Sequence, residues 1–132
     1  MHAHRGNGTK FFMVGATQKL PPKWLSVGVN LCSSDDLQHW EFHSEIFHAA
    51  QISAAPGSVR LERPKLLYSS KTKKYVLWFH LEHEGGGLDH AGGGASGVAS
   101  SATPCGPHTF HHALRPGGLR AKGASLFQDE RF

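Results

Sequence analysis

Histidine is the residue type in this chain whose number and spacing first suggest chemistry. The chain has 11 histidines, and two groups are closely spaced, His80-Leu81-Glu82-His83 and His108 to His112. Neither group matches a zinc template, because there is no Cys-x-x-Cys pair and no His-Glu-x-x-His on a helix. His111 and His112 are neighbours on an expected strand, so they point to opposite faces and do not share a metal easily. We therefore expect no metal site and no cofactor.

Glu62 and His80 are the other candidates for chemistry. Taken alone, Glu62 in the segment 61–65 is most simply a solvated glutamate ahead of a turn. His80 has two interpretations that the residues leave open. Its ring either hydrogen-bonds a sugar hydroxyl or a buried carboxylate, or it is a satisfied histidine of the core.

Three tryptophans, Trp24, Trp40 and Trp78, are aromatic surfaces that could stack on sugar rings. Trp40 and Trp78 fall on expected strand positions, where packing between sheets is the simpler role. Aromatic content therefore does not identify a binding site without further evidence.

The elements that must position these residues read as strands. Apolar runs are short and bounded by Gly, Pro, Asn, Asp or Ser, and no long period of 3.6 residues appears. The pattern predicts strands near 10–15, 26–32, 39–43, 65–69, 74–81, 96–100, 109–113 and 124–128.

Turn residues separate these strands. Asp35-Asp36-Leu37-Gln38 predicts a bend in which Asp side chains bond the backbone, and Lys71-Thr72-Lys73 predicts a hairpin tip. Asn7-Gly8 reads as a hairpin turn more readily than as a glycosylation site. The Gly-rich stretch at 84–95 predicts a flexible loop.

The first half of the chain is loosely repeated in the second. Gly28–Phe42 returns as Gly97–Phe110, and Lys10–Gly15 resembles Lys74–Phe79, with a period in the sixties. Short strands repeated at such a period are typical of stacked four-stranded units, as in propeller blades. The sequence therefore predicts an all-β fold, a partial β-propeller of about two four-stranded blades plus the start of a third.

These blades have approximate bounds. We expect blade one at 3–52, blade two at 58–116 and the start of blade three at 121–132. The last strand of this arrangement has no partner after it, so we expect low stability or self-association through an open blade edge.

Composition excludes several classes of protein. The 132 residues carry a net charge of +4, but the positive charge is scattered apart from the expected hairpin tip, so we expect no nucleic-acid partner. No apolar run of membrane-spanning length exists, so no membrane is expected either. Cys32 and Cys105 show no spacing that indicates a pair, and no signal peptide is visible.

Five segments, in order, resemble a family of glycosidases. Ser33–Phe42 looks like "SSxDLxxWEF", Leu61–Tyr68 like "ERPKVIYN" and Lys73–His80 like "GKYVMWMH". Gly97–Phe110 looks like "GVAxSxxPxGPF", and Ser125–Asp129 looks like "TLFQDDDG". These segments resemble five-bladed propellers of glycoside hydrolase family 43, in the branch of exo-acting galactan β-1,3-galactosidases.

The resemblance implies an inverting hydrolase acting on galactan-type polysaccharide or oligosaccharide. Inversion uses two carboxyl groups roughly 6.5–9.5 Å apart, one as acid and one to activate water. By the resemblance, Glu62 is a catalytic-site carboxylate that binds sugar or tunes the acid. His4 matches the family's "AHGG" segment and His80 its "WMH" segment, which implies substrate-binding roles for both. The family is mostly secreted.

The chain departs from the family pattern in two places. Lys122, Gly123 and Ala124 stand where the family has an Arg-Asp-Met step, whose Asp belongs to the site. The family's general-acid glutamate lies in a later segment, beyond the end of this chain. We therefore expect this truncated chain to be inactive as an enzyme. The alternative is a non-catalytic carbohydrate-binding or pseudoenzyme fragment.

Overall fold

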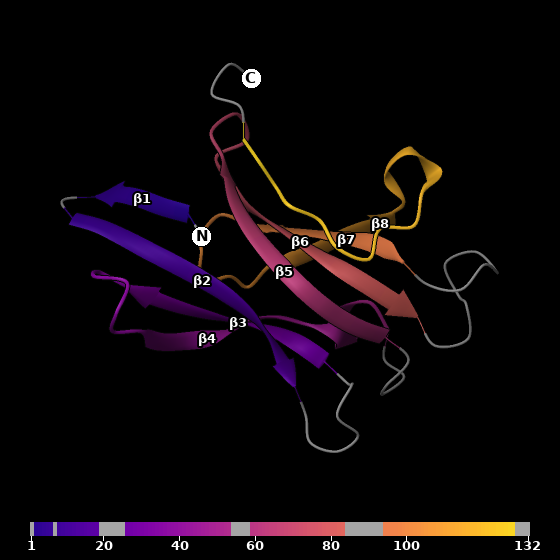
Figure 1. Cartoon of the computed structure of the whole chain (residues 1–132), viewed down its shortest axis with the longest axis horizontal. Helices are drawn as coiled ribbons and strands as arrows, with labels where there is room; N and C mark the ends of the chain where they lie inside the picture. The colour runs from indigo at the N-terminus through magenta and orange to yellow at the C-terminus, as the bar shows by residue number, and fades with distance from the viewer. Residues whose placement is uncertain (1, 7, 19–25, 54–58, 84–93, 129–132) are drawn as a thin grey trace.

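The computed structural model describes residues 2–6, 8–18, 26–53, 59–83 and 94–128, and these form an all-β molecule of two sheets (Figure 1). The described residues do not include Asn7, Trp24, the linker 54–58 or 129–132. Of the loop expected at 84–95, residues 84–93 also lie outside them.

The first sheet contains four antiparallel strands that follow one another in the chain. These are β1 (His2–Gly6), β2 (Gly8–Gln18), β3 (Ser26–Ser34) and β4 (Glu41–His48), in that order across the sheet. A short 3-10 turn, Ala49–Gln51, follows β4.

The second sheet repeats this arrangement. Its strands are β5 (Val59–Ser69), β6 (Lys74–His83), β7 (Ala95–Ser101) and β8 (Thr109–Leu114), again antiparallel and in chain order. The expected fold of about two four-stranded blades is confirmed.

A matching side-chain contact marks the internal repeat. In the first sheet the Ser33 hydroxyl on β3 lies 2.6 Å from Nε2 of His43 on β4. In the second sheet Ser100 on β7 lies 2.7 Å from Nε2 of His111 on β8. The two sheets are thus similar in a specific cross-strand contact as well as in strand order.

One apolar core lies between the sheets. β2 and β3 pack against β5, and the ring of Phe47 lies 5.1 Å from that of Phe79 and 6.4 Å from that of Phe110. Strand residues alternate between faces, so each sheet has one face in this core and one face directed away from it. The most deeply buried members are Val29, Leu31, Ile46, Phe47, Val59, Leu61, Leu77, Phe79, Leu81 and Ala99.

Strand positions agree with the sequence better than strand bounds do. β1 was not expected at all, β4 begins and ends later than the predicted 39–43, and β5 begins six residues before the predicted 65–69. β5 was cut short because its Pro64 reads as a strand breaker, whereas the strand tolerates the proline at a bulge.

The strand expected at 124–128 is wrong. This stretch forms no strand, because no neighbouring strand in the described part of the chain supplies a hydrogen-bonding partner. Residues 119–128 instead cross the outer face of the second sheet as an extended segment, drawn in yellow in Figure 1.

Both expected turns are confirmed. The Asp36 carboxylate accepts hydrogen bonds from the backbone of Gln38 and His39, each at 2.8 Å, and Leu37 takes a positive φ of 65°. At the hairpin tip, Lys73 takes a positive φ of 54°.

Candidate functional site

A bulge in β5 places the candidate residues at the edge of the second sheet. Glu62 pairs with His80 and Lys65 with Trp78, so β5 carries one residue more than β6 between these pairs. Arg63 adopts a positive φ of 51°, and Pro64 has no N–H to leave unpaired. The bulge thus accounts locally for the unusual Glu-Arg-Pro-Lys sequence.

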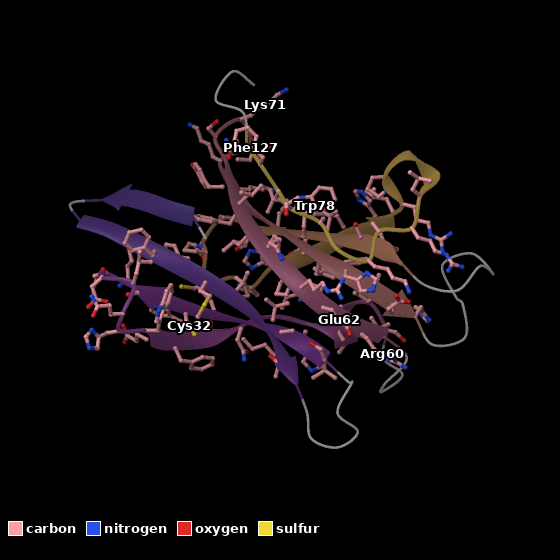
Figure 2. All side chains as sticks on the ribbon, in the orientation of Figure 1. Cys32, Arg60, Glu62, Lys71, Trp78 and Phe127 are labelled. Carbon is pink, nitrogen blue, oxygen red and sulfur yellow. The ribbon has the colours of Figure 1, made fainter. Side chains whose placement is uncertain are left out.

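Glu62 and His80 lie side by side on one face. Glu62 is opposite His80, and His80 is opposite Ser96 on β7, so the three form a row across β5, β6 and β7. Side chains directly opposite in antiparallel strands share a face and stand about 5 Å apart at Cβ. The structure therefore brings together two of the three site residues that the sequence predicts. Figure 2 labels Glu62 beside Arg60.

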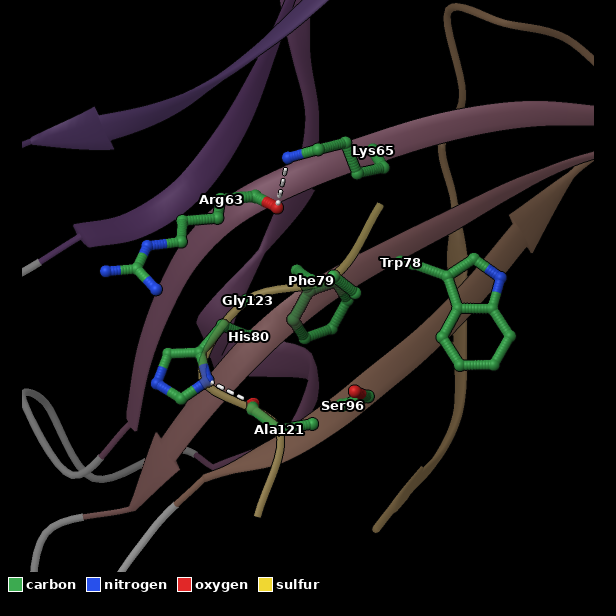
Figure 3. Close-up of a pocket in the computed structure, with 9 residues that line it drawn as sticks. Arg63, Lys65, Trp78, Phe79, His80, Ser96, Ala121 and Gly123 are labelled. Atoms are coloured by element: carbon green, nitrogen blue, oxygen red, sulfur yellow. Dashed lines mark hydrogen bonds between the residues drawn. The ribbon is translucent and has the colours of Figure 1, made fainter. Parts of the chain in front are cut away.

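Both ring nitrogens of His80 have protein partners. Nε2 lies 2.8 Å from Oε1 of Glu82, and Nδ1 donates to the backbone carbonyl of Ala121, also at 2.8 Å (Figure 3). The ring is buried, with 6% of its surface exposed. Of the interpretations left open above, the structure shows the bond to a carboxylate, and it leaves no ring nitrogen free for a sugar in this arrangement.

Glu82 and Arg60 form the neighbouring cross-strand pair on the same face, and the sequence does not predict them as site residues. Glu82 is two residues from His80 on β6, so both point to the same face, and Arg60 pairs with Glu82 across the strands. The alternation of side chains along a strand is the signal that identifies Glu82. It was overlooked because His80-Leu81-Glu82-His83 was considered only as a metal site.

The segment after β8 covers this row. The Ala121 N–H donates to the Gly94 carbonyl at 2.8 Å, and the Arg63 guanidinium donates to the Lys122 carbonyl. Beneath it, between Trp78, His80 and Ser96, is a hollow of about 10 Å³, room for one water molecule (Figure 3). A sugar therefore reaches His80 only if residues 121–124 move aside.

Lys122, Gly123 and Ala124 lie at the site itself. Gly123 and Ala124 line the hollow together with Arg63 and Lys65, whose ammonium group contacts the carbonyls of Arg63 and Pro64 at 3.2 and 3.4 Å. No carboxylate stands at 122–124, where the resemblance implies one.

His4 comes from the other sheet. It lies on β1, paired with Lys10 of β2, and β1 contacts β5. The position of its side chain lies outside what the structure describes. Residues 2–6 around His4 form β1, a strand that the sequence does not predict.

Trp40 and Trp78 do not pack between the two blades, contrary to the simpler expectation. Trp78 alternates with the core residues Leu77 and Phe79, so it faces outward into the hollow beneath 121–124. Trp40 lies next to the β3–β4 turn, and its Nε1 donates to the Leu37 carbonyl at 3.3 Å.

The described residues contain neither a metal-ligating cluster nor a helix that could span a membrane. No three or more His, Cys, Asp or Glu side chains gather there to hold a metal ion. No helix in the part of the chain that the structure describes is long and apolar enough to cross a membrane. Cys32 and Cys105 are both free thiols.

Solved structures of galactan-cleaving enzymes are similar to this chain. A GH43 β-1,3-galactosidase solved with galactodeoxynojirimycin is 29% identical, with a TM-score of 0.67 over 86% of this chain. An exo-β-1,3-galactanase of Phanerochaete chrysosporium, solved with β-1,3-galactotriose, is 28% identical, with a TM-score of 0.76 over 97% of this chain. An exo-β-1,3-galactanase of Clostridium thermocellum is 25% identical, with a TM-score of 0.68 over 99%.

The similarity covers only part of each known enzyme. This chain spans 32%, 28% and 30% of those three chains, respectively. No family model and no curated protein matches the chain. The expected resemblance to a portion of the β-1,3-galactosidase branch of glycoside hydrolase family 43 is confirmed.

Proposed function

Since this chain is similar to the β-1,3-galactan-cleaving glycosidases of family 43, we propose that it supplies two blades of a propeller that hydrolyses galactan chains by an inverting mechanism. The observation that carries the proposal is the row of Glu62 and His80 on one face of the second sheet. That face contains a carboxylate, an oriented imidazole and an aromatic ring, which are the groups that a sugar site requires.

Glu62 is the site carboxylate in this proposal. It is half-buried, and no hydrogen bond joins its carboxylate to another residue in the described ranges. Both oxygens are thus available to accept hydrogen bonds from sugar hydroxyls, or to act on the proton of a neighbouring acid.

His80 and His4 are the proposed substrate-binding residues. Glu82 fixes the His80 ring from Nε2, so Nδ1–H becomes a donor to a sugar hydroxyl when the Ala121 carbonyl moves away. His4 lies on β1, the strand of the first sheet that also contacts β5, and we propose that it contributes to the site from there.

By itself the chain is proposed to be catalytically silent. An inverting hydrolase needs a second carboxyl group acting across the scissile bond from the first. Glu82 shares the face with Glu62, but its carboxylate is bonded to His80 and is not free to serve as the acid.

Binding of β-1,3-galactotriose tests the role of Glu62. The titration uses a chimera in which the remaining blades of the Phanerochaete galactanase follow this chain, because residues 119–128 are expected to join the third blade there and to leave the row uncovered. Glu62→Gln is expected to weaken binding about tenfold, as a charge-assisted hydrogen bond is lost. Glu45→Gln, on the first sheet, serves as the control. Equal affinities for both variants contradict the proposal.

The alternative, a non-catalytic carbohydrate-binding fragment, is favoured by one observation. Lys122-Gly123-Ala124 brings no carboxylate to the site. If the alternative holds, the chimera binds galactotriose through Glu62 without hydrolysing it.

A further inference from the structure

A second hollow lies far from Glu62, at the turn between β3 and β4. It has a volume of about 260 Å³, and its lining includes Lys10, Ser34, Asp35, His39, Trp40 and Glu41. Figures 1 and 2 show this turn at the left end of the molecule and Glu62 well to the right of it. The hollow at the turn is therefore not an extension of the Glu62 site. It is also much larger than the hollow beneath residues 121–124, which has room for a single water molecule.

The turn that forms this hollow is held rigidly. The Asp36 carboxylate accepts hydrogen bonds from the backbone N–H groups of Gln38 and His39, and it lies 2.7 Å from Nδ1 of His39. These bonds, above all the one with the His39 ring, hold the pKa of the Asp36 carboxyl well below its usual range. The Ser34 hydroxyl accepts from the backbone of Asp36 and Leu37. The side chains around the hollow thus stand on a pre-formed support.

The groups that face the hollow are available to a ligand. Lys10, Asp35 and Glu41 form no hydrogen bond or ion pair with another residue in the described part of the chain. The bond from Trp40 Nε1 to the Leu37 carbonyl fixes the plane of the indole. The hollow therefore offers one ammonium donor, two carboxylate acceptors and an aromatic surface that is already oriented.

This combination matches one class of ligand. Separated donors and acceptors around an aromatic plane recognise a neutral polyhydroxylated ring, whose hydroxyls both donate and accept while its C–H face stacks. The two carboxylates repel phosphates and other anions. The described residues form no metal-ligating group here, which disfavours a cation.

We propose that the hollow at the β3–β4 turn is a second carbohydrate-binding site, which holds a neutral galacto-oligosaccharide away from the Glu62 face. The identity of the sugar rests on the proposed function. Such a site retains a polymer on the protein while another part of the same polymer occupies the Glu62 face.

Nuclear magnetic resonance of the 132-residue chain with β-1,3-galactotriose tests this site. The indole N–H signal of Trp40 and the amide signals of 34–41 are expected to shift with increasing sugar. The double variant Asp35→Asn/Glu41→Gln removes both acceptor charges at exposed positions without touching the Asp36 network. It is expected to raise the apparent dissociation constant at these signals about tenfold.

Two controls separate this site from the proposed active face. Glu62→Gln is expected to leave the Trp40 shifts unchanged, and cellotriose is expected to shift them less than galactotriose does. Shifts confined to residues around Glu62 and His80 overturn the second site and leave the proposed function intact. Shifts at Trp40 alone uphold the second site and leave the proposed function intact, because residues 121–124 cover the Glu62 face in this chain. Trp40 shifts that persist in the double variant also overturn the second site.

Discussion

His108 is a buried histidine whose environment penalises its charge. Only 1% of its surface is exposed, and neither ring nitrogen has a hydrogen-bond partner among the described residues. Its backbone N–H donates to the Ile46 carbonyl, so the residue lies against β4 of the first sheet. Burial in these surroundings lowers the pKa of His108 from 6.5 to about 4.

The stability of the chain is expected to fall with acid because of His108. Its folded pKa is depressed, so the unfolded chain takes up the proton first as pH falls. The stabilisation is complete above pH 6.5 and is lost as the pH approaches 4, a decrease of about 3 kcal/mol. Urea unfolding at several pH values checks this. In His108→Leu the pH slope is expected to flatten, and in the exposed His112→Leu it is expected to persist. Identical slopes in all three proteins would contradict the burial argument.

Gly123 is a residue at which a carboxylate can be restored. A Cβ added there lies 3.2 Å from a guanidinium nitrogen of Arg63, the flexible end of an exposed side chain. Gly123→Asp is therefore expected to pair with Arg63 and to stabilise the covering segment, by less than about 1 kcal/mol because the pair is exposed. Thermal unfolding at low and high salt measures it, with Gly123→Asn as the uncharged control. A gain that survives high salt, or one that the Asn variant shares, would contradict the ion pair.

The candidate residues could be named from the sequence, but their partners could not. Glu62 and His80 were found because their segments resemble a known family, and the structure places them opposite each other. The Ala121 carbonyl that occupies His80 comes from 41 residues further along the chain. Nothing local in a sequence encodes a contact of that kind, because it depends on where the segment after β8 is laid across the sheet.

At the scale of elements, β6 and β7 pack closely at the point where the Phe79 ring of β6 lies over Gly97 of β7. Gly97 is opposite Phe79, and a Cβ on Gly97 would lie 2.1 Å from the Phe79 ring. Gly97→Ala is expected to destabilise the fold by about 1–3 kcal/mol, since it overpacks this contact. Gly15→Ala on β2, where nothing lies within 4 Å, is the matched control and is expected to be neutral or slightly stabilising. Urea unfolding that ranks the two variants equally would refute the packing argument.

Strand elements with clear alternation were predictable, and elements that depend on partners were not. Residues 74–81 read as a strand from their own sequence and became most of β6. Residues 124–128 also read as a strand but have no neighbouring strand in the described part of the chain, so they stayed extended without a ladder. β5 was foreshortened because a bulge, which absorbs Pro64, is a property of two paired strands rather than of one segment.

At the scale of the whole molecule, the first sheet exposes an apolar row on the face away from the core. Met13, Cys32 and Phe42 are opposite one another on β2, β3 and β4, and Met13 and Phe42 are 43% and 61% exposed. The other face of this sheet is covered by the second sheet, whereas this apolar row is exposed. An exposed apolar row of this kind favours association between copies of the chain.

We therefore expect the chain to self-associate at high concentration. Sedimentation velocity over a wide range of protein concentrations should show a rising mean mass. The double variant Met13→Thr/Phe42→Thr keeps β-propensity while removing the apolar row, and it should remain monomeric. Lys71→Thr, at the hairpin tip, controls for a simple change of surface residue. A wild-type chain that stays monomeric throughout the range would refute this expectation.

The central claim is that this chain supplies Glu62 to a galactan-hydrolysing propeller whose other carboxyl group it does not contain. The most direct measurement is the rate of β-1,3-galactotriose hydrolysis by the 132-residue chain and by the chimera with the remaining blades. We expect no hydrolysis by the chain alone, hydrolysis by the chimera, and a loss of about 10²–10⁴-fold in the chimera with Glu62→Gln. Either of two results would contradict this proposal. One is hydrolysis by the chain alone that Glu62→Gln abolishes, and the other is a chimera whose rate of hydrolysis is unchanged by Glu62→Gln.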